Sequence, residues 1–150
     1  MATFLIIDTA LEEAIVALGK DGKIIGELTN KETHSHASFI QVAIETVLER
    51  QQIAMKELDA IVVTLGPGSY TGLRVGLATA KGMAYALEKP LIGLSTLKVL
   101  AAAAIQSSST KIDASTQIFS MIDARRMEVY SAIFTPNFEN KRAVQAEIIT

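Results

Sequence analysis

The sequence contains no cysteine and only two histidines among its 150 residues. Without cysteine there are no disulfides, thiolate zinc sites or cysteine nucleophiles, and a reducing cytoplasm is the expected location. His34 and His36 stand two residues apart, without the i, i+4 helical spacing of a zinc protease and without a glutamate between them. We therefore predict no metal site.

The sequence also lacks an excess of either charge and any long apolar run. Its formal net charge is −2, so it does not have the bulk positive charge of a protein that grips nucleic acid by itself. Any RNA contact would use a local patch or the surface of a partner. No segment approaches the ~20 apolar residues that cross a bilayer, and the first residues lack the basic region of a signal peptide. With 49% apolar residues, we expect a folded cytoplasmic protein that does not enter a membrane.

Apolar periodicity predicts a mixed α/β order of elements. Three strands at 4–7, 14–18 and 24–28 open the chain, and Asp21-Gly22 between the last two predicts a tight hairpin. The rest of the predicted order is helix 38–52 with a capping box at Ser38, strand 61–65, helix 71–87, strand 90–94 and a helix from Ser95 through 104.

A change of composition divides the chain. Residues 106–116 are rich in serine, threonine and lysine, which is typical of a boundary. Strands are expected at 118–122 and 128–134, joined as a hairpin, whereas the residues after Pro136 have little periodic signal. We predict a first domain at 1–106 with βββαβαβα order and a mixed sheet, followed at 107–150 by a linker and the start of an incomplete second unit.

The segment Gly66–Gly76 joins a buried strand to a helix through a glycine-rich turn. Exposed N–H groups at such a helix start can bind an anion. The spacing of Gly66, Gly68 and Gly72 misses the dinucleotide fingerprint by one residue, and no Walker lysine follows. Nucleotide-binding candidates are Asp8, Thr9, Gly66, Gly68 and Ser69. As an alternative, the glycines only make the turn, and Asp8 ends its strand by bonding to nearby backbone.

Small residues repeat every four positions on the predicted helix 71–87. They are Gly72, Gly76, Ala80 and Ala84, which therefore line one face. Each helical glycine costs about 1 kcal/mol relative to alanine, so a close approach of another backbone is expected there. Two interpretations stay open, namely packing on the chain's own sheet or helix, and contact with another subunit. Leu73, Leu77 and Met83 add apolar surface beside the small residues.

Several motifs together resemble the TsaB (YeaZ) family of bacterial tRNA threonylcarbamoyladenosine biosynthesis proteins. They are residues 5–10, the block 66–76, the strand 90–93, and Asp123-Ala124-Arg125 with Glu128-Val129-Tyr130. The resemblance implies the two-lobed actin/Hsp70/sugar-kinase (ASKHA) fold. It also implies a paralogue, TsaD, whose metal-binding histidine pair aligns with Thr96 and Leu100 here. Because neither side chain replaces imidazole, the resemblance implies a subunit that is not catalytic alone.

The resemblance further implies partners. In the family, TsaB pairs with TsaD through helices that correspond to 38–52 and 71–87, and it forms a homodimer through the same surface. A TsaE-like ATPase is a further partner, and tRNA is reached only through the complex. No cofactor is required by this chain, although ATP or ADP is a candidate ligand at the partner interface. The implied interface residues are Phe39, Ala43, Val47, Gly72, Leu73, Gly76, Leu77, Ala80, Met83 and Ala84.

Two other functions compete with this prediction. An active nucleotide-dependent ATPase or kinase of the same fold would use Asp8 and the glycine turn. A peptidase would need a nucleophile beside a base, and no Gly-x-Ser-x-Gly elbow or base near Ser69 is evident. The partner subunit is the function that we predict.

Overall fold

The computed structural model describes residues 2–31 and 36–148, which fall into two compact units. The first unit comprises residues 1–65 and 69–94, and the second comprises 66–68 and 95–150. The division between the units at Ser95 does not coincide with the expected domain boundary at 106, because the helix that follows Ser95 groups with the second sheet. Within the described ranges, none of the helices is long and apolar enough to span a membrane.

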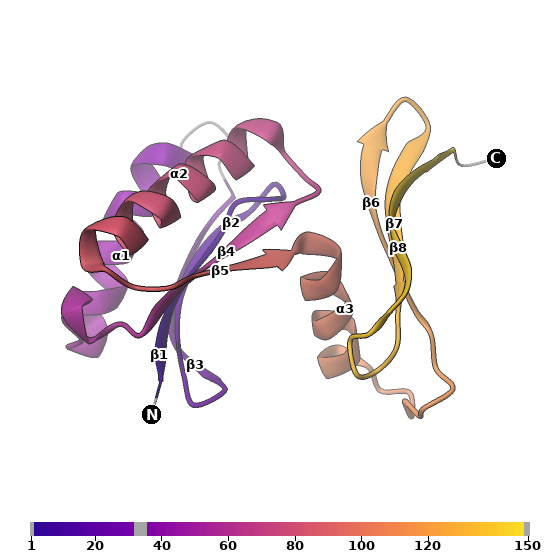
Figure 1. Ribbon diagram of the computed structural model, residues 1–150, viewed down its shortest axis with the longest axis horizontal. Helices are drawn as coiled ribbons and strands as arrows, with labels where there is room; N and C mark the ends of the chain where they lie inside the picture. Colours follow the sequence, from indigo (N-terminus) through magenta and orange to yellow (C-terminus); the bar gives the residue numbers. More distant parts are fainter. Residues whose placement is uncertain (1, 32–35, 149–150) are drawn as a thin grey trace. The chain divides into compact units, whose positions relative to one another are not determined.

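The first unit is a five-stranded mixed sheet with two helices on one side (Figure 1). The strand order is β3-β2-β1-β4-β5, with β1 antiparallel to β2 and parallel to β4. The elements, in chain order, are β1 Thr3–Asp8, β2 Ala14–Lys20, β3 Lys23–Asn30, α1 His36–Gln51, the 3₁₀ helix η1 Met55–Glu57, β4 Ala60–Gly66, α2 Tyr70–Leu87 and β5 Leu91–Ser95.

Buried and partly buried side chains alternate along the central strand β1, so one face of the sheet packs against the helices. Leu5 and Ile7 of β1 are fully buried and belong to the core, whereas Phe4 and Ile6 between them are only partly buried. The same core contains Ile40 and Val47 of α1. Since each buried aliphatic side chain contributes about 1.5–3 kcal/mol, this layer is what holds α1 and α2 on the sheet.

The second unit is an antiparallel sheet of order β6-β7-β8, together with one helix (Figure 1). Leu97 and Ala101 of the helix pack with Ala132 and Phe134 of the sheet to form a separate small core. The elements are α3 Thr96–Ser107, β6 Ile118–Arg125, β7 Glu128–Phe134 and β8 Asn140–Ile148.

The sequence predicted most of these elements, with three corrections. The strand β8 was missed, because its strand character comes from pairing with β7 rather than from a clear apolar alternation. Helix α1 begins at His36, so Ser38 lies inside the helix and is not its N-cap. The short helix η1 was also missed. His34 lies outside the described residues.

Candidate functional site

The carboxyl ends of β1 and β4 meet because these parallel strands pair from Phe4 with Ala60 to Ile7 with Val63. Asp8 follows on β1 and Thr64 follows on β4. The Thr64 hydroxyl donates a hydrogen bond of 2.8 Å to Asp8 Oδ1, and the Ala10 N–H donates one of 3.0 Å to the same oxygen. These two bonds fix the Asp8 carboxylate at the end of β1. The bond from Ala10 is the contact with nearby backbone that the sequence analysis named as one alternative for Asp8.

Thr9 joins this strand end to α2. Its side chain is fully buried, and its hydroxyl donates a 2.7 Å hydrogen bond to the carbonyl oxygen of Gly72. The role of Thr9 as a nucleotide ligand stays a prediction, and in the described conformation its hydroxyl is enclosed and donates to Gly72. Its role is to attach the first turn of α2 to the end of β1.

Ser69 caps α2 and ties it to the loop after β1. Its Oγ accepts a 3.3 Å hydrogen bond from the Gly72 N–H, and its own N–H donates a 2.7 Å bond to the carbonyl oxygen of Ala10. The preceding turn has a cis Gly66–Pro67 peptide and a φ of 107° at Gly66. Residues 66–68 group with the second unit, so the arrangement described here consists of first-unit residues alone.

The stripe of small residues on α2 faces the chain's own sheet. All four residues are buried within the single chain. A Cβ atom at Gly72 would overlap the carbonyl oxygen of Thr9, and one at Gly76 would overlap the hydroxyl of Thr9. The close approach that the glycines permit is thus between α2 and β1. This corrects the prediction that Gly72, Gly76, Ala80 and Ala84 contact another subunit.

The other predicted interface residues divide between buried and partly buried positions. Ala43 and Val47 are each 1% exposed and belong to the core, so they are also unavailable to a partner. Four are partly buried and remain candidates: Phe39, Leu73, Leu77 and Met83. Of these, Phe39, Leu77 and Met83 pack against the core.

The outward side of α1 and α2 carries a set of exposed residues that the sequence analysis did not select. Among them, Val42 is 62% exposed and Tyr85 is 89% exposed. Near the start of α2, the Arg74 guanidinium donates a 2.9 Å hydrogen bond to the Tyr70 hydroxyl. We define the outer helix face as Val42, Glu45, Glu49, Tyr70, Arg74, Lys81 and Tyr85. Helical spacing could have found it, since these residues lie on the polar sides of their helices.

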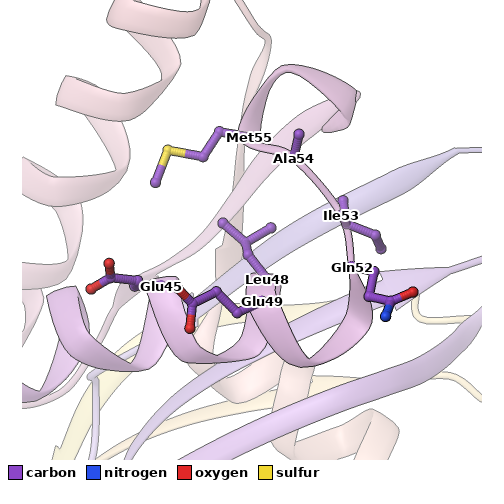
Figure 2. A pocket seen from close by; sticks show the side chains of 7 residues that line it. All are labelled: Glu45, Leu48, Glu49, Gln52, Ile53, Ala54 and Met55. Carbon is purple, nitrogen blue, oxygen red and sulfur yellow. The ribbon is translucent and has the colours of Figure 1, made fainter.

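A shallow hollow of about 310 Å³ lies where α1 ends and η1 begins (Figure 2). Met55 lies across it from Leu48, and Glu45 and Glu49 stand on the α1 side (Figure 2). Gln52, Ile53 and Ala54 complete the lining. No pattern in the sequence predicts this hollow, because it depends on the turn into η1.

The metal that the TsaD resemblance implies has no matching donor set here. Thr96 is 1% exposed in the second unit, and Leu100 packs against the apolar core of that unit. A hydroxyl and an aliphatic side chain at these positions do not form a pair of imidazole ligands. Among residues 2–31 and 36–148, no group of three histidine, cysteine, aspartate or glutamate side chains could hold a metal ion.

Comparison with solved structures defines the class of fold. EutJ from Carboxydothermus hydrogenoformans superposes with a TM-score of 0.54 at 13% identity over 99% of this chain, a likeness of fold alone. The structure of YeaZ from Pseudomonas aeruginosa superposes with a TM-score of 0.84 at 28% identity, covering 99% of this chain and 68% of that chain. The chain is thus an α/β protein with the mixed sheet of the ASKHA type.

Sequence comparison identifies the family. Residues 23–148 match the family described as TsaD: tRNA N6-adenosine threonylcarbamoyltransferase, and the chain belongs to this family. The tRNA threonylcarbamoyladenosine biosynthesis protein TsaB of Escherichia coli is 36% identical over 130 residues, which are 85% of this chain and 53% of the relative. TsaB of Bacillus subtilis is 33% identical over 132 residues, or 88% and 55%. The chain spans about half the length of these curated relatives, and the resemblance to TsaB is confirmed.

Proposed function

We propose that this chain is a non-catalytic subunit that binds a TsaD-like partner and supports threonylcarbamoylation of adenosine in tRNA. The observation that carries the proposal is the family match over residues 23–148, together with relatives that are named TsaB. Thr96 and Leu100 stand where the TsaD resemblance implies metal-binding histidines, and neither side chain replaces imidazole as a ligand. This favours a supporting role over a catalytic one.

The outer helix face is the surface that we assign to the partner. Exposed single apolar residues are ordinary, but Val42 and Tyr85 lie on adjacent helices that share one core. The face carries Glu45 and Glu49 on α1, and Arg74 and Lys81 on α2. A partner of the same family would present a related pair of helices. When the two pairs dock face to face in opposite orientations, the acidic helix of one protein lies against the basic helix of the other.

The remaining partners are those that the family resemblance implies. Alone, two copies of the chain would pair through it, and a TsaE-like ATPase would join the assembly with the TsaD-like subunit. We place any ATP or ADP at the surface shared with the partner, and we expect tRNA to be engaged within the complex. No cofactor is assigned to this chain by itself.

Reconstitution tests the function. The chain would be mixed with a TsaD-like protein, a TsaE-like ATPase, the threonylcarbamoyl-adenylate donor, ATP and unmodified tRNA. Formation of threonylcarbamoyladenosine that depends on the chain is the expected result. Equal product without the chain would contradict a supporting role. ATP turnover by the chain alone that Asp8→Ala abolishes would favour an active nucleotide enzyme instead.

A further inference from the structure

The hairpin between β6 and β7 has an unusual backbone. Arg125, Arg126 and Met127 are consecutive and have φ values of 69°, 54° and 63°. Left-handed φ is uncommon for residues other than glycine, because Cβ crowds the backbone there. Three such residues in succession place a conformational cost on this turn.

The turn is fixed by its own hydrogen bonding and pairing. The Arg125 N–H donates a 2.7 Å hydrogen bond to Asp123 Oδ1, and Arg125 pairs with Glu128 across the hairpin. Arg126 and Met127 are then the two loop residues, both left-handed, a pattern that normally selects Asn-Gly or Asp-Gly. Because glycine or asparagine would adopt these φ values at lower cost, the presence of arginine and methionine here points to a role other than folding.

Among the residues that the structure describes, the two arginine side chains of this turn have no bonded partner. Within residues 2–31 and 36–148, neither guanidinium takes part in an ion pair or hydrogen bond. Arg142 in the same sheet contrasts with them, since it bonds to Ser131 at 2.8 Å and pairs with Glu147. Arg125, Arg126 and Met127 are all exposed, and Met127 is 71% exposed.

Because the β6–β7 turn exposes two adjacent guanidinium groups, we infer that Arg125 and Arg126 bind phosphate groups of an RNA backbone. Guanidinium groups bind phosphate oxygens through two parallel hydrogen bonds, and unpaired ones do so without first breaking an ion pair. Neither the hollow beside η1 nor a second one, between the end of α3 and the start of β6, includes the turn, and a free nucleotide would require a concave site. An extended polyanion fits a protruding turn. The inference rests on the proposed function, which supplies tRNA as the RNA.

The first test measures the salt dependence of RNA binding. Unmodified tRNA would be titrated with the complex of the full chain and its TsaD-like partner by fluorescence anisotropy between about 20 and 200 mM salt. Replacement of one arginine, Arg125→Gln or Arg126→Gln, should weaken binding and reduce the slope of log affinity against log salt by about one. Lys56→Gln removes the same charge from an exposed site in the first unit and should leave the slope unchanged.

A second pair of variants separates binding from folding. Arg126→Gly and Met127→Gly should both raise the midpoint of thermal unfolding, since each relieves a left-handed residue. Only Arg126→Gly should weaken tRNA binding. A purely structural turn would respond to both substitutions alike.

Three results would overturn the inference. They are no tRNA binding by the unaltered complex at the lowest salt, arginine variants that bind like Lys56→Gln, and displacement of tRNA by ATP at equal phosphate concentration, which would indicate a nucleotide site. Association with the TsaD-like partner is measured separately. Unaltered tRNA binding by variants that still form the heterodimer refutes the RNA contact alone, whereas failure of the unaltered chain to form the heterodimer refutes the proposed function.

Discussion

The two faces of α2 are built from different residues, and only one of them is covered within the chain. The inner face consists of Gly72, Gly76, Ala80 and Ala84, all buried against the chain's own sheet. The outer face presents larger side chains, among them Tyr85, which is 89% exposed. A row of small residues therefore indicates a close backbone approach but does not identify the neighbour. Here the neighbour is β1, and the surface left for a partner is the opposite one.

The largest expected effect comes from filling the inner face. Gly76→Leu would drive a side chain into the hydroxyl of Thr9, and the contact involves the centre of the sheet. We expect a loss of about 4 kcal/mol or more in the free energy of unfolding, measured by urea denaturation. A folded variant of normal stability would show that α2 does not approach β1 closely. Gly82→Leu is the matched control, because the space around Gly82 is open.

Removing the hydrogen bond between β1 and α2 should have a smaller effect. Thr9→Val keeps the side-chain shape but leaves the Gly72 carbonyl oxygen without its buried donor. The expected loss is about 1–3 kcal/mol in the free energy of unfolding. Thr71→Val, at an exposed position of the same helix, should change stability little. Equal stability of the two variants would argue against the Thr9–Gly72 bond.

The outer face should tolerate substitution in the isolated chain. Tyr85→Ala removes an almost fully exposed ring, so the free energy of unfolding should change by no more than about 0.5 kcal/mol. Thermal and urea unfolding would check this. A clear loss of stability would mean that the outer face packs within the chain, and the contrast between the two faces would fail.

The smallest effect is expected for the pair of Tyr70 and Arg74. Tyr70→Phe removes an exposed hydrogen bond while the guanidinium keeps its position 5.1 Å from the ring centre. We expect a change of a few tenths of a kcal/mol at most in the free energy of unfolding, because water replaces the lost partner. A loss above about 1 kcal/mol would show that this pair is part of the helix packing.

Local sequence signals predicted those elements whose conformation follows from the preferences of their own residues. Asp21-Gly22 predicted the first hairpin, and both residues have the positive φ of such a turn. The second hairpin uses Arg126 and Met127 instead, so its turn type was not predictable from residue preference. The strand β8 was missed because its pairing with β7 is non-local.

The candidate site was less predictable than the fold. Asp8 was correctly expected at the end of a strand, and Ser69 was placed in the turn before α2. The burial of Thr9 could not be predicted, since it depends on the distance between β1 and α2. The same distance decides whether the small stripe faces inward or outward. Periodicity finds a face of a helix, but only packing determines what covers it.

Association with a TsaD-like protein tests the central claim most directly. The affinity of the chain for that partner would be measured for the unaltered chain, for Tyr85→Ala and for Ile24→Ala, which removes a 54% exposed residue from β3 instead. We predict that Tyr85→Ala weakens the heterodimer about tenfold while Ile24→Ala does not change it. Equal affinities for all three proteins would contradict the assignment of the outer helix face to the partner.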